Sequence, residues 1–147
     1  MRIVHLAFVI VAAGLMAGAA MGDSLLLNLV ADLSGPAIDG VTPTGRAEWR
    51  ADKNQFSKKE LRVEVRNVNL PDGTLVVLDA CSVEDLASFR ISGGSGRLEL
   101  RTDSGDFVPV CSRGQPRQDD GFTGSDTVRV KLPGADLGIL FGTFRTR

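Results

Sequence analysis

The residue types that most often carry out catalysis are scarce in this chain. Its only histidine is His5, which lies in an N-terminal segment that we expect to be removed, and the chain has no tyrosine. Ser-His-Asp and Cys-His systems need an imidazole as their base, and many zinc, copper and non-haem iron sites use it as a ligand. We therefore predict a protein that is not an enzyme and has no cofactor, although carboxylates, lysines and hydroxyls remain for chemistry.

Aspartates gather in two segments that have the composition of loops. Asp103 and Asp106 flank Ser-Gly, whereas Asp119, Asp120 and Asp126 lie in DDGFTGSD. Carboxylate oxygens on a loop suit calcium, and a pair of carboxylates suits glycoside cleavage. The spacing does not match an EF-hand, and Asp and Gly are also ordinary turn residues. We predict no metal site or catalytic pair, leave calcium binding open, and keep Asp119, Asp120 and Asp126 as a candidate loop binding surface.

Arginine dominates the positions that we expect to face outward from strands. The chain carries a net charge of −1, so basic sheet faces would be balanced by acidic loops. A basic face attracts anionic polymers such as acidic polysaccharides or lipopolysaccharide. Single-stranded nucleic acid is disfavoured because aromatic residues for base stacking are missing. The interpretation that we prefer is that arginine stems cover the sheet and pair with glutamates on neighbouring strands. Polymer binding is the alternative, through Arg62, Arg66, Arg97 and Arg101.

The N-terminus predicts export. Arg2 precedes an apolar run from Ile3 to Met16, and small residues follow up to Gly22. This order is typical of a cleaved secretory signal, here residues 1–22, with cleavage after Ala19, Ala20 or Gly22. An uncleaved anchor is the alternative, because the run approaches the ~20 residues that a spanning helix needs. We expect a secreted or periplasmic protein.

Two cysteines remain after removal of the signal. Cys81 and Cys111 would lie in an oxidising compartment, where a single disulfide is the simplest interpretation and a pair of reactive thiols is the alternative.

Period-2 alternation of apolar and charged residues predicts antiparallel strands throughout residues 23–147. In Leu61–Arg66, for example, leucine and valines alternate with Arg62, Glu64 and Arg66. The "PDG" at residues 71–73 predicts a turn, which we interpret as a hairpin between this strand and TLVVL. VEDL at residues 83–86 is a candidate for one helical turn. The other expected strands are SLLLNLVADL, Ala47–Ala51, TLVVLDAC, LASFRIS, GRLELRT, DFVPVCS, DTVRVKL and GILFGTFRT.

Short strands separated by turn signals at this spacing predict an all-β fold. We expect one antiparallel β-sandwich domain, Ig-like or small and barrel-like, at residues 23–147 after the signal peptide.

Several segments carry a resemblance to known proteins: LSGPAIDGVTPTGRAEWR, LRVEVRNVNLPDGTLV, GRLELRTDSGDFVPV and ILFGTFR. Together they resemble uncharacterised secreted bacterial β-sandwich proteins, and the first resembles the start of CHRD-type domains. The resemblance implies an exported β-sandwich without an assigned activity. The histidine-bearing segment of CHRD-type domains has no counterpart here, so no metal role is carried over.

These observations predict an exported, non-catalytic structural or interaction module of the periplasm, cell envelope or extracellular space. Its partner would be a protein or an envelope polymer.

Overall fold

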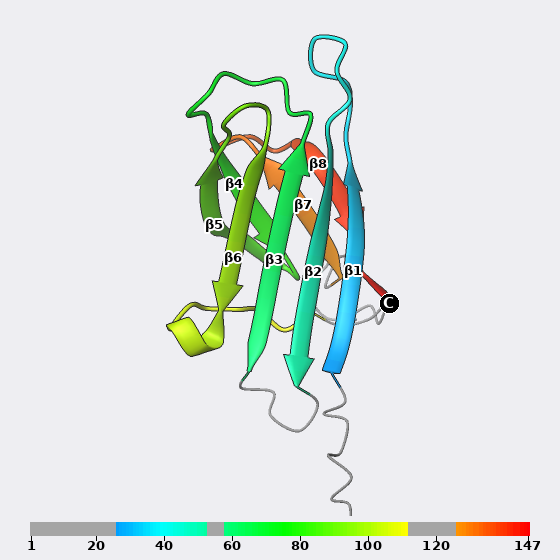
Figure 1. The fold of residues 1–147 in the computed structure, drawn as a ribbon, viewed down its shortest axis with the longest axis vertical. Coiled ribbons are helices and arrows are strands. Elements are labelled where there is room, and N and C mark those ends of the chain that lie inside the picture. Colours follow the sequence, from blue (N-terminus) through cyan, green and yellow to red (C-terminus); the bar gives the residue numbers. More distant parts are fainter. Residues whose placement is uncertain (1–25, 53–57, 112–125) are drawn as a thin grey trace, which may run out of the picture.

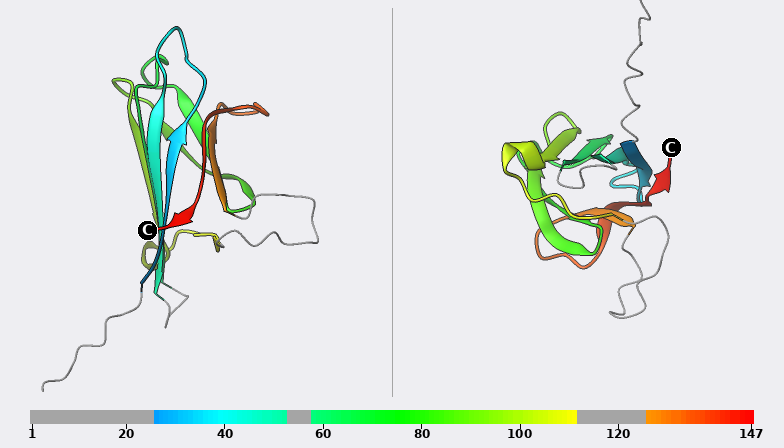
Figure 2. Two further views of the ribbon diagram at one scale, coloured as in Figure 1. Left: turned by 90° about the vertical axis from the view of Figure 1, so that its right-hand side faces the viewer. Right: turned by 90° about the horizontal axis from the view of Figure 1, so that it is seen from below.

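The strands form two layers that face each other. The computed structural model describes residues 26–52, 58–111 and 126–147, so the expected signal segment lies outside the described residues. Figure 1 shows one layer in front of the other, and Figure 2 shows the layers edge-on. The front layer contains β1 (Leu26–Ser34), β2 (Thr44–Asp52), β3 (Lys59–Arg66) and β6 (Gly96–Arg101). The back layer contains β4 (Leu75–Ala80), β5 (Val83–Arg90), β7 (Thr127–Lys131) and β8 (Gly138–Thr143).

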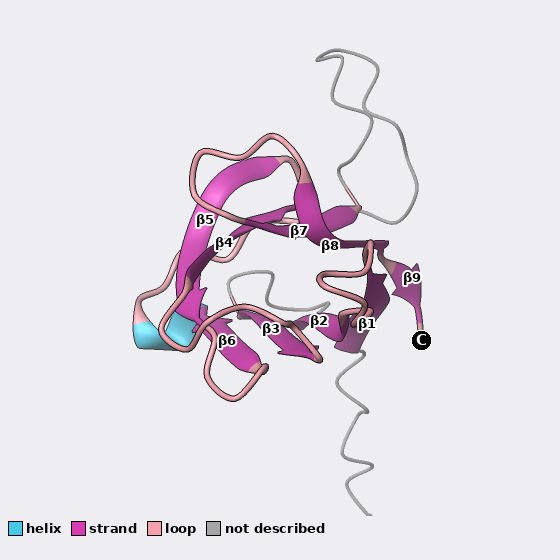
Figure 3. Cartoon of the chain, turned by 90° about the horizontal axis from the view of Figure 1, so that it is seen from above, coloured by secondary structure: helices cyan, strands magenta, loops and turns pink. Residues whose placement is uncertain are grey.

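The two layers are one antiparallel sheet that nearly closes into a barrel. The strand order is β5-β4-β7-β8-β1-β2-β3-β6, and the short β9 (Arg145–Thr146) also pairs with β1. At one side the layers are joined where Ser34 of β1 pairs with Phe141 of β8. At the other side β5 and β6 lie next to each other without a described ladder, as Figure 3 shows from above. The predicted all-β fold is therefore confirmed, in a form between a sandwich and a barrel.

Alternation explains how these strands build a core. Along β2 and β3 every second side chain is buried, including Trp49, which is 1% exposed, and Leu61 and Val63, which are fully buried. Side chains of the back layer, such as Leu78 and Leu140, fill the space from the other side. At the joined side the backbones of β1 and β8 approach closely. Gly142 permits this approach, since a Cβ at this position would overlap the Asp32 carbonyl oxygen.

The PDG turn is confirmed, but the hairpin that we expected around it is wrong. The Thr74 N–H donates to the Pro71 carbonyl oxygen at 3.1 Å, and Gly73 has a φ of 84°. However, β3 pairs with β2 and β6, whereas β4 pairs with β5 and β7. The turn thus carries the chain from the front layer to the back, and Val68 is buried in this crossover. Alternation predicts which face of a strand is buried, but it does not predict which other strand pairs with it.

Two other sequence-based expectations are wrong. VEDL is not helical but begins β5, after a two-residue turn in which Cys81 and Ser82 have φ values of 53° and 68°. The only described helical element is the 3₁₀ turn η1 (Thr102–Ser104). DFVPVCS is not a strand from Phe107 to Cys111. Part of the reason is Pro109, which has no N–H to give to a ladder.

Residues 106–111, which we call the strap, cross one end of the barrel instead. Val108 is 1% exposed, and the Pro109 carbonyl accepts a hydrogen bond from Trp49 Nε1 at 2.9 Å. The expected disulfide is confirmed: Cys111 at the end of the strap is bonded to Cys81 in the β4–β5 turn. Both cysteines are buried, so the strap is fixed at its middle by the indole and at its end by a covalent bond.

We predict that replacing both cysteines by serine lowers the free energy of unfolding by about 3–4 kcal/mol, because the disulfide closes a loop with a sequence separation of 30 residues. Urea unfolding followed by the fluorescence of Trp49 measures this change, since Trp49 is the only tryptophan. Wild-type protein treated with dithiothreitol is the matched control and should unfold at the same urea concentration as the variant. Equal unfolding midpoints for the oxidised wild type and the variant would contradict the prediction.

Candidate functional site

The outer face of the front layer carries a regular array of charges. On β2 the outward residues are Arg46, Glu48 and Arg50, and they lie opposite Glu64, Arg62 and Glu60 of β3. The β3 residues in turn lie opposite Arg97, Glu99 and Arg101 of β6. Every one of these cross-strand neighbours has the opposite sign, so positive and negative side chains alternate along the strands and across them.

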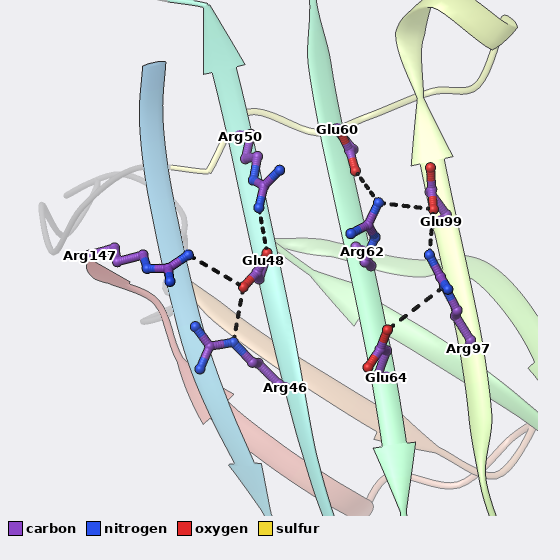
Figure 4. Close-up of polar contacts among 9 residues, drawn as sticks. All are labelled: Arg46, Glu48, Arg50, Glu60, Arg62, Glu64, Arg97, Glu99 and Arg147. Atoms are coloured by element: carbon purple, nitrogen blue, oxygen red, sulfur yellow. Dashed lines mark hydrogen bonds and ion pairs between the residues drawn. The ribbon is translucent and has the colours of Figure 1, made fainter. Parts of the chain in front are cut away.

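The array places the four predicted polymer-binding arginines among carboxylates, and Figure 4 shows this for Arg62 and Arg97. Arg62 contacts Glu60 at 3.0 Å and Glu99 at 3.3 Å, and Arg97 contacts Glu99 at 3.0 Å. Glu99 thus brings two of these arginines together, and the hydrogen bond from Arg97 is the main reason that the pKa of Glu99 lies below its ordinary value. The other two lie further along the strands: Arg66 is 3.7 Å from Glu64, and Arg101 is 2.6 Å from Asp103.

A second carboxylate has a similar position on β2. Glu48 lies among Arg46, Arg50 and the C-terminal Arg147, at 3.0, 2.9 and 4.0 Å (Figure 4). Partial burial would raise the pKa of Glu48, but the surrounding arginines, with the hydrogen bond from Arg46 first among them, hold it below the ordinary value. The guanidinium groups on this face therefore neutralise carboxylates of the same face.

The predicted acidic loop surface is only partly described. Asp119 and Asp120 lie outside the described residues, and Asp126 lies just before β7, where its carbonyl accepts a hydrogen bond from the Phe144 N–H at 2.7 Å. The carboxylates of Asp103 and Asp106 both accept hydrogen bonds from Arg101 at the end of β6. Asp103 accepts from its guanidinium group, and Asp106 accepts from its backbone N–H at 2.9 Å. Within the described ranges, no group of three or more His, Cys, Asp or Glu residues is arranged to hold a metal ion.

The outer face of the back layer contains a partly buried ion cluster that our sequence reasoning missed. Asp79 of β4 and Lys131 of β7 point away from the core, yet they are only 8% and 7% exposed. Asp79 Oδ2 accepts from Arg129 Nη2 at 2.5 Å and from Arg129 Nε at 2.9 Å, and lies 3.2 Å from Lys131 Nζ. Lys131 also contacts Asp85 Oδ1 at 3.1 Å. We call Asp79, Asp85, Arg129 and Lys131 the ion cluster.

The cluster depends on an irregular β5. The register between β4 and β5 shifts after Leu78, and Asp85 has a φ of 48°. In this position the Asp85 N–H donates to Asp79 Oδ1 at 2.9 Å, while its carboxylate reaches Lys131. One signal in the sequence pointed here: Asp79 is a lone charge inside the apolar run LVVLDA, where an unpaired carboxylate would be costly.

The protonation states of Asp79 and Lys131 fit a structural role better than a catalytic one. Burial would raise the pKa of Asp79, but hydrogen bonds from the Asp85 N–H, Arg129 and Lys131 hold it below its ordinary value. The pKa of Lys131 is raised, chiefly by its hydrogen bond with Asp85. A carboxylate that stays ionised is a poor general acid, and a lysine that stays protonated is neither a base nor a nucleophile at neutral pH.

A cleft of about 510 Å³ lies beside the ion cluster, a volume in the range of small-molecule and side-chain sites. The β4–β5 turn and the start of β5 line one part of it, and β7, β8 and the loop between them line the rest. Among its lining residues are Ser82, Glu84, Arg129, Asp136, Phe141 and Thr143.

Comparison with known proteins does not place the chain in a family. No family model, no curated protein and no solved structure matches it. The resemblance to secreted bacterial β-sandwich proteins and to CHRD-type domains thus stays a prediction. Among the described residues, no helix is long and apolar enough to cross a membrane.

We predict that Asp79→Asn lowers the free energy of unfolding by about 2–3 kcal/mol near neutral pH, because it leaves the Arg129 and Lys131 charges without their shared carboxylate. Removing one partner of a fully buried pair costs about 3–5 kcal/mol, and the smaller figure reflects an Arg129 side chain that is 34% exposed. Urea unfolding of both proteins between pH 3 and 8 measures the difference.

The pH dependence of this difference has a defined sign. The folded-state pKa of Asp79 is lowered, so its contribution is complete above the unfolded-state value of about 4 and is lost as the pH falls through the folded-state value. Asp32→Asn is the control, because Asp32 pairs with arginines at the surface, where an ion pair contributes about 1 kcal/mol or less. A difference for Asp79→Asn that does not shrink in acid would contradict the assignment.

Proposed function

We propose that this chain is an exported, non-catalytic structural or interaction module. The observation that carries the proposal is that the charged side chains of the front-layer array and of the ion cluster are engaged with one another. On the front layer the arginines and glutamates pair both across strands and along them, and on the back layer the ion cluster pairs internally. Such groups hold strands together and leave no acid, base or nucleophile poised among them.

Export is supported by the covalent bond between Cys81 and Cys111, because disulfides persist in oxidising compartments and are rare in the cytosol. The positive, apolar and small-residue order of the first 22 residues agrees with it. The periplasm, the cell envelope and the extracellular space each meet this condition.

The charge array disfavours the alternative of an anionic-polymer binder. We predict that the protein elutes from a sulfated-dextran column at or below about 0.15 M NaCl, because Arg62, Arg66, Arg97 and Arg101 already face carboxylates. The double variant Glu64→Gln with Glu99→Gln is the matched positive control. It frees Arg97 of both carboxylate partners and should elute at higher salt. Strong retention of the wild type, lost on reversing the four arginines to glutamate, would favour the alternative.

The proposal as a whole is tested by native mass spectrometry on protein purified gently from the cells that make it. We expect a chain that lacks its first 19–22 residues and is two hydrogens lighter than the reduced form, with a macromolecular partner attached in fixed stoichiometry. Retention of the N-terminal segment would contradict cleavage. A bare chain under every gentle condition, together with turnover in a broad substrate screen, would overturn the assignment to a non-catalytic module.

A further inference from the structure

The two cations that line the cleft, Arg129 and Lys131, already have partners within the protein. Arg129 donates from Nε and Nη2 to Asp79 and from Nη1 to the Asp136 carbonyl oxygen at 3.0 Å. Lys131 Nζ lies between two carboxylates, at 3.2 and 3.1 Å. The ion cluster contains two carboxylates and two cations, so its formal charge is zero and it offers no free positive group to an anionic ligand.

The charges that remain at the cleft are negative. Glu84, near the start of β5, and Asp136, in the β7–β8 loop, both line the cleft and are exposed. Neither carboxylate forms an ion pair with another described residue, in contrast to Asp79 and Asp85. Because the ion cluster is neutral and these two carboxylates are unpaired among the described residues, the cleft favours a ligand with a positive charge.

An aromatic ring lines the same cleft. Phe141 lies on β8 directly opposite Arg129 of β7 and is 57% exposed, although a phenylalanine on a strand is usually covered. An exposed aromatic face attracts a cation through its quadrupole, and its apolar surface suits the methylene stem of a lysine or arginine. The ring and the two carboxylates therefore favour the same chemistry.

We propose that this cleft binds a lysine or arginine side chain from a basic segment of a partner protein. The inference rests on the proposed function and names the chemistry of the partner. The hydroxyls of Ser82 and Thr143, which also line the cleft, are suited to bind the peptide groups that flank such a side chain.

The probe for the test is a fluorescein-labelled octapeptide of alternating glycine and lysine, titrated with the full mature protein and followed by fluorescence anisotropy. We expect saturable binding that weakens as NaCl rises from about 0.05 to 0.3 M, because the contact is electrostatic. The same peptide with glutamate or norleucine in place of lysine should not bind. Equal binding of the norleucine peptide would overturn the proposal, because the contact would then be apolar only.

Variants test whether the peptide binds in the cleft. Glu84→Gln combined with Asp136→Asn should weaken binding about tenfold, and Phe141→Ala about threefold or more. The matched control is Asp39→Asn combined with Asp103→Asn, which removes the same charge from the β1–β2 turn and η1, away from the cleft, and should change binding less than twofold. The replaced side chains are exposed, and unfolding curves check that each variant remains folded.

The outcomes separate this inference from the function on which it rests. If a protein partner co-purifies with the chain but the lysine peptide does not bind, the cleft assignment is wrong and the interaction module stands. If the control variant weakens binding as much as the cleft variant does, the attraction comes from overall charge and the cleft assignment is again wrong. If the peptide does not bind, no partner co-purifies and the protein turns over a substrate, both proposals fail.

Discussion

The alternation of charge across β2, β3 and β6 constrains the register of the front layer. Apolar alternation alone excludes a slip of one residue, because such a slip would turn every buried side chain toward solvent. It permits a slip of two residues, which keeps leucines and valines inside. Here such a slip would place Arg46 opposite Arg62 and Glu48 opposite Glu60 or Glu64, because the signs alternate along each strand. Each surface pair contributes little, yet together they make the wrong registers repulsive.

The register of the front layer also sets the positions of groups that connect it to the back layer. It brings Trp49 to the end of the barrel where its indole N–H donates to the strap, and the strap in turn carries Cys111 to the β4–β5 turn. The disulfide holds that turn at the point where β5 begins, next to the register shift between β4 and β5 that accompanies the contact of Asp85 with Lys131. The positions of the ion cluster and the cleft on the back layer thus depend on contacts of the front layer, namely the hydrogen bond of Trp49 to the strap and the disulfide that follows it.

Local patterns in the sequence predict the strands well but not their arrangement. Alternation identified β2, β3, β6 and β7, and the PDG turn was recognised from the backbone preferences of its residues. The neighbours of each strand were not predictable, because β3 and β4 are adjacent in sequence and belong to different layers. Alternation in DTVRVKL places Lys131 on the outer face, and it is buried there because Asp79 and Asp85 come from strands that only the tertiary fold brings together. The cleft was not predictable for the same reason, since residues from β4, β5, β7, β8 and the loops between them line it together.

The first and last strands of the chain lie side by side. β1 has β2 on one edge and residues of β8 and β9 on the other, with Leu29 and Val30 opposite Thr146 and Arg145. The joined side of the barrel therefore needs both β1 and the distant β8 and β9, and its contacts span almost the whole described sequence. Folds with contacts this distant in sequence form slowly. Until β8 and β9 pair with β1, this edge of β1 keeps backbone N–H and C=O groups without partners, so a partly folded chain would present an open sheet edge that the closed barrel covers.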